Sequence, residues 1–282
     1  MNQITIGDFE LTVVSGGTLR GDGGNMFGVV PRVLWERICL PDDDNRILMD
    51  TNCLLVRTPN SLGLIDTGYG DKAPQNVRRR ACMEDGALLV RNLKAAGVTP
   101  DEVDWVILTH LHFDHAGGAT TVDSDGQLQP VFPNARHYVQ QIEWEDATSG
   151  RAELKGAYSP ADFRPFEEAG LLTLIDDAHE ICAGITTHRT GGHTRGHQLV
   201  SLSSGDQTVV YLGDVCPMIG HMRALWTMAY DQYPLTTRQT KPQILGAIAD
   251  QNQIAVLAHD PQARIVRLQR DARTEFKVLP VD

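Results

Sequence analysis

The stretch THLHFDHAGG, residues 109–118, places three histidines and one aspartate within six positions, directly after the apolar run VDWVILT. Neutral imidazoles and carboxylates are the groups that a divalent transition metal takes from a protein. If the extended backbone continues through His110 and His112, their side chains leave the same face and reach one ion. Asp114 and His115 follow where the loop must turn, so they are available to a second ion beside the first.

A histidine is more often a surface group or a satisfied core group than a metal ligand. This alternative fits the loop poorly, because three imidazoles and a carboxylate at the end of an apolar strand form a desolvated cluster that is costly without a cation. The stretch therefore predicts a metal centre.

The bulk properties of the chain exclude several classes of protein. It has 282 residues, 41% hydrophobic content and a net charge of −11, without repeats or a linker, so we expect one domain over 1–282. The acidic balance argues against nucleic-acid binding, and the single basic run, 78–80, reads as a solvated turn or helix face. Asp8 and Glu10 do not suit a signal peptide, and no apolar run approaches a membrane span of roughly 18 residues. We expect a cytoplasmic protein with no membrane partner.

The five cysteines are scattered and form no C-x-x-C pair, which predicts free thiols and no disulfide framework. Cys216 lies two residues after Asp214, and its sequence position is compatible with a buried small apolar group or with a place near a metal.

Hydrophobic periodicity predicts strands in groups, broken by a few helices. This pattern is typical of the α/β class, with sheets covered by helices. We expect one strand over 4–17, two strands within 52–68 around the turn TPNSLG, a helix at about 84–97 that Gly97 ends, a strand at 103–109, helices around 138–148 and 241–251, and a hairpin over 264–279.

The motif HLHFDH reads as H-x-H-x-D-H and resembles the signature loop of the metallo-β-lactamase superfamily. The other parts of that pattern follow in the expected order: LIDTG at 64–68, GGHTRGH at 191–197, LGD at 212–214 and LAHD at 257–260. The resemblance spans nearly the whole chain. It implies a four-layer αβ/βα sandwich with the active site at the edge between the two sheets.

The resemblance also implies the ligands of two divalent metal ions, and zinc is the expected metal. His112 stands where the redox-active diiron members usually carry Glu, which favours zinc and hydrolysis, although manganese, iron and cobalt accept similar ligands. The implied sets are His110, His112 and His193 for one ion, Asp114, His115 and His259 for the other, Asp214 as the bridge, and Asp66 and His197 as groups that orient the ligands.

Two further stretches, 16–35 and 226–237, resemble the branch of the superfamily that contains quorum-quenching N-acyl-homoserine lactonases. This implies a small-molecule substrate whose lactone ring is opened by a metal-bridging hydroxide, with Asp114 passing a proton to the departing alkoxide. A related hydrolase that acts on aryl esters, phosphotriesters or thioesters remains the alternative, since the metal motifs do not identify the substrate.

Several side chains in these two stretches are candidates for binding the substrate. The apolar ones either line an acyl pocket or belong to the core, and the 26–35 loop is also able to pack against a second copy in a homodimer. The candidates are Met26, Phe27, Val29, Val30 and Trp35 in the first stretch, and Trp226, Met228 and Tyr230 in the second.

One position departs from the pattern of the well-known acyl-homoserine lactonases. They place a tyrosine three residues after the bridging aspartate, whereas this chain has Pro217 there. We rank Tyr230 first as its replacement, since a phenol can donate a hydrogen bond to a developing oxyanion, followed by Asp231 and His221.

Overall fold

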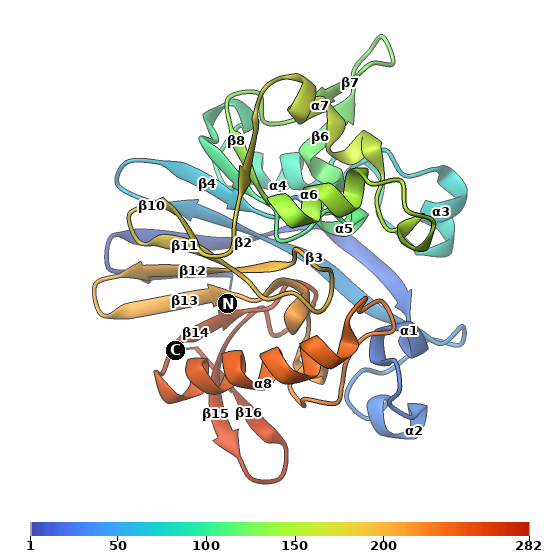
Figure 1. The fold of residues 1–282 in the computed structure, drawn as a ribbon, viewed down its shortest axis with the longest axis vertical. Coiled ribbons are helices and arrows are strands. Elements are labelled where there is room, and N and C mark those ends of the chain that lie inside the picture. Colours follow the sequence, from blue (N-terminus) through green and yellow to red (C-terminus); the bar gives the residue numbers. More distant parts are fainter. Residues whose placement is uncertain (1, 282) are drawn as a thin grey trace.

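The computed structural model describes residues 2–281, which form two seven-stranded sheets (Figure 1). The strands lie in the order β1-β2-β3-β4-β5-β8-β9 in the first sheet, and β10 to β16 follow one another in the second. The first sheet consists of β1 (Gln3–Ile6), β2 (Phe9–Asp22), β3 (Arg46–Arg57), β4 (Leu62–Ile65), β5 (Trp105–Ile107), β8 (Arg136–Gln140) and β9 (Leu172–Ile175). The second consists of β10 (His179–Cys182), β11 (Ile185–Arg189), β12 (Gln198–Ser204), β13 (Gln207–Tyr211), β14 (Ile254–Val256), β15 (Ile265–Asp271) and β16 (Glu275–Pro280), and β6 (Thr120–Val122) pairs with β7 (Leu128–Pro130) outside both sheets.

Helices cover the outer face of each sheet. Leu89 and Leu93 of α4 belong to a buried cluster with the first sheet, and Leu245 and Ile248 of α8 belong to one with the second. The layers are therefore helix, sheet, sheet, helix, which confirms the predicted α/β sandwich. The helices are α1 (Gly23–Phe27), α2 (Arg32–Trp35), α3 (Gln75–Arg80), α4 (Leu88–Ala95), α5 (Phe113–Ala116), α6 (Gln141–Thr148), α7 (Arg164–Glu168) and α8 (Pro234–Asp250).

The central core lies between the two sheets. Its cluster combines Leu54 and Val56 of β3 with Val200 of β12 and Val209 of β13, all of them fully buried. Strands that carry β-branched and other apolar residues on both faces fit this place, because each sheet is covered on its other face by helices as well. Burying the apolar faces of both sheets stabilises the sandwich and fixes the strand ends at one edge.

The element boundaries differ from the predictions in four places. The predicted strand over 4–17 is two strands, because Gly7 adopts a φ of +49° and turns the chain between β1 and β2. Helix α4 is shorter than 84–97, although Gly97, with a φ of +76°, follows its end as expected. The segment 136–140 is a strand, so α6 begins at Gln141, and α8 begins at Pro234, seven residues before the predicted start.

The basic run at 78–80 is only partly a solvated face. Arg79 and Arg80 are exposed, but Arg78 is buried and its guanidinium donates to the carboxylate of Asp85 and to the carbonyl oxygen of Glu84. Arg78 thus holds the turn that follows α3.

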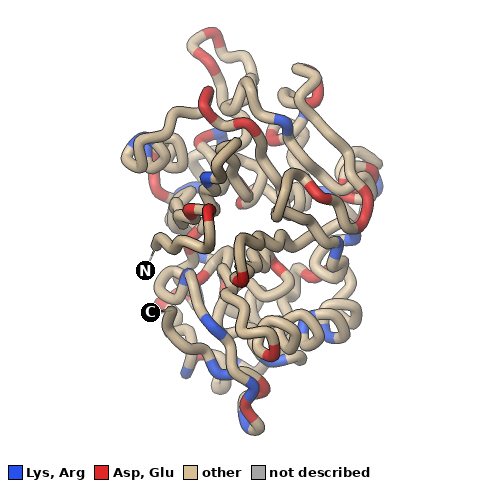
Figure 2. Tube along the Cα trace, turned by 90° about the vertical axis from the view of Figure 1, so that its left-hand side faces the viewer, with Lys and Arg blue, Asp and Glu red and all other residues tan. Residues whose placement is uncertain are grey.

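In Figure 2, Lys and Arg are interspersed with Asp and Glu along the trace.

The five cysteines are free thiols, as predicted. Cys216 is buried beside Met222, and it is in none of the potential metal-ligand groups among residues 2–281. It therefore fills the core as a small apolar group.

None of the helices described for 2–281 is long and apolar enough to span a membrane. Val29 and Val33 are exposed around α2, and their packing against a second copy stays a prediction.

Candidate metal centre

The predicted ligands lie on loops that follow β5, β11, β13 and β14. Ligand sites in α/β folds form beyond the carboxyl ends of strands, where loops from several strands meet. His112 keeps an extended backbone, with a φ of −67° and a ψ of 154°, before α5 begins at Phe113. His110 and His112 therefore point to the same place, as the alternation predicts, and His110 Nε2 lies 3.0 Å from His112 Nδ1.

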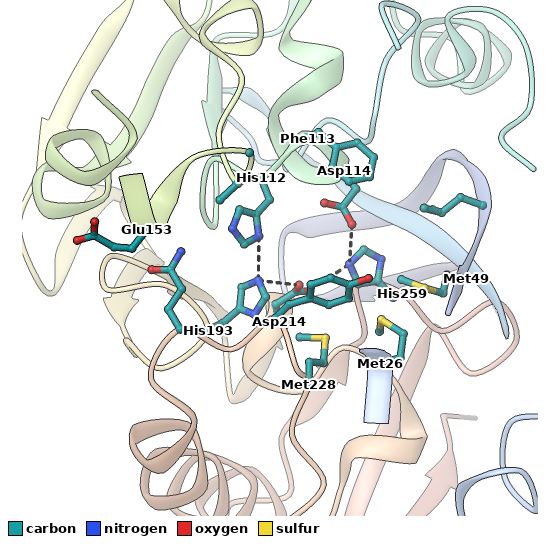
Figure 3. A pocket seen from close by; sticks show the side chains of 16 residues that line it. Met26, Met49, His112, Phe113, Asp114, Glu153, His193, Asp214, Met228 and His259 are labelled. Atoms are coloured by element: carbon teal, nitrogen blue, oxygen red, sulfur yellow. Dashed lines mark hydrogen bonds and ion pairs between the residues drawn. The ribbon is translucent and has the colours of Figure 1, made fainter. Parts of the chain in front are cut away.

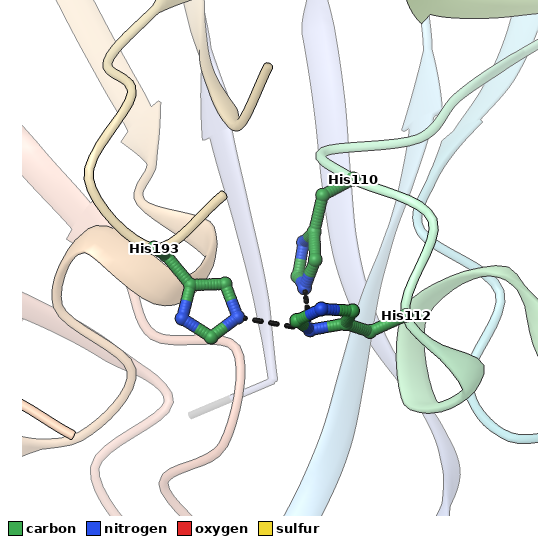
Figure 4. Close-up of side chains that lie close together, drawn as sticks. All are labelled: His110, His112 and His193. Carbon is green, nitrogen blue, oxygen red and sulfur yellow. Dashed lines mark hydrogen bonds between the residues drawn. The ribbon is translucent and has the colours of Figure 1, made fainter. Parts of the chain in front are cut away.

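His193 completes what we term the first ligand group, which consists of His110, His112 and His193 (Figure 4). His193 comes from the loop between β11 and β12, and its Nε2 lies 3.0 Å from His112 Nδ1. The three ligand nitrogens converge from two loops on one point. Two of these imidazoles are buried and His112 is half-buried.

The second ligand group consists of Asp114, His115 and His259. His115 Nε2 lies 3.1 Å from His259 Nε2, and His259 Nε2 lies 3.6 Å from Asp114 Oδ2. Asp114 and His115 stand on α5, the short helix into which the signature loop turns, whereas His259 follows β14 of the other sheet. This group joins the two sheets at their edge.

Asp214 lies between the two groups. Its Oδ2 is 3.2 Å from His193 Nε2, and its Oδ1 is 3.1 Å from His259 Nε2 and 3.4 Å from His115 Nε2. Oδ1 is buried and has no hydrogen-bond partner among residues 2–281. A buried carboxylate oxygen without a donor, beside imidazole nitrogens that face one another, fits divalent cations and fits little else. The seven residues therefore suit divalent metal binding.

Four of the ligand histidines have a fixed orientation because their other ring nitrogen is hydrogen-bonded. His110 Nδ1 lies 3.1 Å from the hydroxyl oxygen of Thr109, which itself donates to Asp66. His115 Nδ1 donates to Asp66 Oδ2 at 2.8 Å, and His193 Nδ1 donates to Asp231 Oδ1 at 2.9 Å. His259 Nδ1 donates to a backbone carbonyl oxygen, that of residue 50, at 2.8 Å. Each bond puts the proton on Nδ1 and leaves the Nε2 lone pair toward the centre.

Asp66 has a strained backbone, with a φ of +56°, directly after β4. Its carboxylate also accepts from the backbone N–H of Thr109 at 2.8 Å and from the hydroxyl of Tyr211 at 3.1 Å. A left-handed conformation at an aspartate is costly and persists where the surroundings determine it. Here it aims the carboxylate at the back of His115.

His197 orients the bridging aspartate and has no nitrogen left for a metal. Its Nε2 accepts from the backbone N–H of Asp214 at 2.8 Å, and its Nδ1 lies 2.6 Å from the hydroxyl oxygen of Thr190. Complete burial and the neighbouring His193 lower the pKa of His197 to about 3, so its imidazole stays neutral.

The electrostatics of the metal-free ligands also favour a cation. Burial and the adjacent histidines hold the pKa of His110 and that of His112 well below the usual range. Although burial alone favours its protonated form, Asp214 keeps its pKa well below the usual range because His115 and His259 lie beside it. Burial favours the neutral forms of His115, His193 and His259 as well, but the neighbouring carboxylates, Asp214 in each case, raise the pKa of all three. A metal would replace this positive charge beside Asp214, because ligands bind it as neutral imidazoles and ionised carboxylates.

A cavity of about 340 Å³ opens over the ligands (Figure 3). His112, Asp114, His193, Asp214 and His259 form its polar part. Its other lining residues are Leu19, Gly21, Met26, Met49, Phe113, Glu153, Gly156, Ala157, Met228, Tyr230 and Gln232.

The structure separates the substrate candidates into two sets. Met26, Met228 and Tyr230 line the cavity. Phe27, Trp35 and Trp226 do not, because they pack on one another in a buried cluster, with Phe27 stacked on Trp35 at 5.2 Å between ring centroids and Trp226 at 5.8 Å from Phe27. The expectation that these three contact substrate is therefore corrected: they support the wall of the cavity from behind. Val30 is buried in the same cluster, and Val29 is exposed.

The two lower-ranked replacements for the missing tyrosine are also placed away from the substrate. His221 is buried, stacks on Phe27 at 4.8 Å and donates from Nε2 to the carbonyl oxygen of Met26 at 2.7 Å. Asp231 is buried behind His193, whose imidazole it orients. No local pattern indicates this second role, because Asp231 lies 38 residues from His193 in the chain.

Another supporting residue that the sequence analysis missed is Glu143 of α6, which is fully buried. Its carboxylate accepts from the backbone N–H of Leu111 at 3.0 Å and from the hydroxyl of Thr194 at 2.6 Å. It thus ties the loop of His112 to the loop of His193. Burial raises the pKa of Glu143 above its ordinary value, although these two hydrogen bonds act in the opposite direction. Glu143 is the sixth residue of the helix predicted around 138–148, and nothing in the sequence marks it as buried.

The chain belongs to the metallo-beta-lactamase superfamily, whose family model matches residues 46–282. The ligand groups and the sandwich described above are consistent with that assignment, and the protein is a metal-dependent hydrolase of this superfamily.

The chain is similar to individual hydrolases and lactonases of this superfamily. An N-acyl homoserine lactonase of a Bacillus species is 30% identical over 159 residues, which cover 52% of this chain and 55% of the lactonase, so the match spans little more than half of that relative. A crystal structure of a probable metal-dependent hydrolase from Staphylococcus aureus superposes with a TM-score of 0.90 at 29% identity and covers 99% of both chains. AidC, a dizinc quorum-quenching lactonase, shares the fold with a TM-score of 0.82 at 23% identity, covering 99% of this chain and 97% of its own.

Proposed function

We propose that the protein is a dinuclear metal hydrolase that opens the ring of an N-acyl-homoserine lactone or a close analogue. One observation carries this proposal: His112, Asp114, His193 and His259 of the two ligand groups line, together with Asp214, a cavity whose other walls include Met26, Met49 and Met228. An acyl-homoserine lactone has a polar ring and an apolar chain, so its two parts match the two parts of the cavity. The similarity to lactonases supports the same substrate class.

Zinc is the metal that we propose for both ligand groups, because five imidazoles and two carboxylates are typical donors for it. Two bound zinc ions supply Lewis acidity toward a carbonyl oxygen and lower the pKa of coordinated water. The chain holds them with His110, His112 and His193 on one side and with Asp114, His115 and His259 on the other, and Asp214 faces both.

Asp114 is the ligand best placed to handle a proton. Its side chain is 15% exposed and lines the cavity, whereas the carboxylate of Asp214 is nearly covered. In the proposed reaction, hydroxide adds to the lactone carbonyl carbon, and Asp114 takes the proton of that added hydroxyl and passes it to the ring oxygen as the bond between the ring oxygen and the carbonyl carbon breaks. The product is an open-chain hydroxy acid.

Tyr230 takes the role of the hydroxyl that Pro217 cannot supply. Tyr230 lines the cavity, and Asn25 Nδ2 donates to its phenol oxygen at 3.1 Å. Since Asn25 occupies an acceptor lone pair of the phenol, the phenol proton stays available to a substrate oxygen. Burial and the negative charge of Asp114 raise the pKa of Tyr230, against the effect of Asn25, which keeps this donor protonated at neutral pH.

The methionines provide an adaptable site for the acyl chain. Thioether side chains are flexible and polarisable, so they fit chains of different length and shape. Gly21 leaves room between them, because a Cβ at this position would lie 3.0 Å from Met49 Sδ and 3.6 Å from Met26 Cγ. We therefore expect kcat/KM to rise with acyl length until the apolar wall is filled.

The test is hydrolysis of a lactone series by the zinc-loaded protein, followed by a pH indicator and by NMR of the ring-opened product. The proposal predicts that acyl-homoserine lactones are hydrolysed faster than unsubstituted γ-butyrolactone, and that a chelator abolishes and Zn²⁺ restores the activity. If no lactone in the series is opened faster than in buffer by protein that contains two zinc ions per chain, the substrate proposal is wrong.

A further inference from the structure

A buried ionic group lies behind His259, on the side away from the cavity. The carboxylate of Asp50 on β3 is only 1% exposed. Its Oδ2 lies 2.5 Å from a guanidinium nitrogen of Arg264, and its Oδ1 accepts from the hydroxyl of Ser15 at 2.5 Å. None of these three side chains lines the cavity or belongs to a ligand group within 2–281. The proposed reaction therefore does not use them directly.

The backbone of Asp50 holds His259 at two points. Its N–H donates to the carbonyl oxygen of His259 at 3.1 Å, and its carbonyl oxygen accepts from His259 Nδ1 at 2.8 Å. The second bond sets the tautomer and the ring orientation of the ligand. Any movement of residue 50 therefore moves the imidazole of His259.

The next residues of β3 hold the backbone on both sides of His259. The N–H of Asn52 donates to the carbonyl oxygen of Ala258 at 2.8 Å. Its side-chain Nδ2 donates to the carbonyl oxygens of Leu257 at 2.9 Å and of Asp260 at 2.8 Å. A strand of the first sheet thus binds the ligand loop of the second.

A bulge in β2 directs Ser15 to Asp50. The β2–β3 register skips between Ser15, which is paired with Asn52, and Thr18, which is paired with Asp50. Gly17 has a φ of +118°, and its carbonyl oxygen accepts from the hydroxyl of residue 51. Bulges occur beside active sites, where they redirect side chains. This one gives the Asp50 carboxylate its second partner.

We propose that Asp50, held by Arg264 and Ser15, is a positioning residue that sets the affinity of the second ligand group for its metal through the backbone contacts to His259. The inference rests on the proposed dinuclear centre. The first ligand group is not affected, because its His193 is oriented by Asp231 and its loops are tied by Glu143. Outer partners of metal ligands are typically worth about 10–100-fold in affinity.

The experiment measures the two metal positions separately. Wild-type protein and the Asp50→Asn variant are titrated with ¹¹³Cd²⁺, and NMR gives one resonance for the three-imidazole group and another for the group with a carboxylate of its own. Asp50→Asn keeps the backbone carbonyl that accepts from His259 and disturbs only the carboxylate that positions it, so Cd²⁺ binding at the second group is expected to weaken by about 10-fold, the lower end of that range, and binding at the first to stay unchanged.

Two controls make the result specific. Asp250→Asn breaks an Asp–Arg pair with the same substitution, but Asp250 and Arg270 are more than half exposed, so both resonances should titrate as in the wild type. Asp231→Asn should weaken the first group and spare the second. Should the Asp50 variant fail to fold, Ser15→Ala removes one partner of the carboxylate only and should give a smaller loss at the same position.

The outcomes separate this inference from the function on which it rests. Equal weakening of both metal positions by Asp50→Asn, or unchanged affinity at the second, would overturn the positioning role. Wild-type protein that binds a single Cd²⁺ would instead contradict the proposed dinuclear centre itself.

Discussion

The two ligand groups differ in charge although they share Asp214. The first contains three imidazoles, whereas the second contains two imidazoles and the carboxylate of Asp114. A dication in the first group therefore keeps more of its positive charge than one in the second. This asymmetry suits a reaction in which one side polarises a carbonyl group and the other side receives a departing oxygen.

The groups also differ in what holds them. His193 donates a hydrogen bond to the buried carboxylate of Asp231. His259 donates instead to the backbone carbonyl of Asp50, whose side chain forms a buried ion pair with Arg264. In the metal-free chain, carboxylates raise the pKa of a histidine in each group against the effect of burial, that of His193 in the first and that of His115 in the second. One bridge therefore joins two positions whose supports are largely separate, with Asp66 and Thr109 as the contact between them, and each position can be tested by itself.

The largest effect is expected from Asp214→Ala, which removes the one ligand that both groups share. We expect loss of metal from both positions. Since the metal ions polarise the substrate, kcat/KM should fall on the order of 10³-fold or more. Metal analysis and lactone kinetics measure the result. A matched Asp114→Ala variant should retain metal in the first group; if both variants lose the same single ion, the bridge is assigned wrongly.

The matched pair Asp231→Asn and Asp66→Asn should split the groups. Each substitution takes a carboxylate from one ligand histidine, His193 at 2.9 Å or His115 at 2.8 Å. We expect Asp231→Asn to weaken metal binding at the first group by about 10–100-fold and Asp66→Asn to do so at the second, because an amide is a poorer acceptor and can present its NH₂ to the imidazole N–H. Asp66→Asn should also cause a smaller loss at the first group, since the Thr109 hydroxyl donates to Asp66 and lies 3.1 Å from His110 Nδ1. Competition with a chromophoric chelator measures both affinities, and a loss shared equally by the two groups would argue against independent support.

The sequence predicted the ligands far better than their supports, for a physical reason. Ligands follow strand ends in short continuous motifs, and the spacing in His110-x-His112 translates directly into a shared face. The supports act over long distances in the chain. Asp231 is 38 residues from its partner His193, and Glu143 is 51 residues from its partner Thr194. No local periodicity records such a contact, so only the folded chain reveals it.

The substrate residues show the same limit at closer range. Met26 and Phe27 are neighbours in one apolar run, yet Met26 lines the cavity and Phe27 stacks between Trp35 and His221 in the core. A short helix sends adjacent side chains in different directions, and apolar letters do not tell a pocket wall from the core behind it. The fold class was predictable because the period of the hydrophobic pattern distinguishes strands from helices. The lining was not.

A smaller effect is expected at Tyr230, which lines the cavity and accepts a hydrogen bond from Asn25. Tyr230→Phe should lower kcat/KM for an acyl-homoserine lactone by about 10-fold, the cost of one hydrogen bond to a developing charge. Asn25→Asp should give a similar loss, because a carboxylate accepts the phenol proton and withdraws it from the cavity.

The double variant decides whether the two residues act together. If Asn25 acts through the phenol, Asn25→Asp has no further effect when Tyr230 is already Phe. Asn60→Asp, an exposed change of the same charge in the turn after β3, is the matched control and should leave kcat/KM unchanged. Additive losses in the double variant would show that Asn25 does not work through Tyr230, and full activity in Tyr230→Phe would remove the tyrosine from the mechanism.

The smallest effect concerns a buried histidine outside both groups, which provides a reference for the ligand histidines. His137 stacks on Phe166 at 4.4 Å, and burial lowers its pKa to about 4. The unfolded chain takes up this proton near pH 6.5 and the folded chain does not, so the free energy of unfolding falls as the pH drops below that value. From pH 7 to pH 6 the contribution is about 0.7 kcal/mol. Urea unfolding of His137→Phe should show a pH slope reduced by this amount relative to the wild type, and nearly parallel curves from pH 8 to pH 7; equal slopes below pH 7 would mean that His137 is protonated in the folded chain.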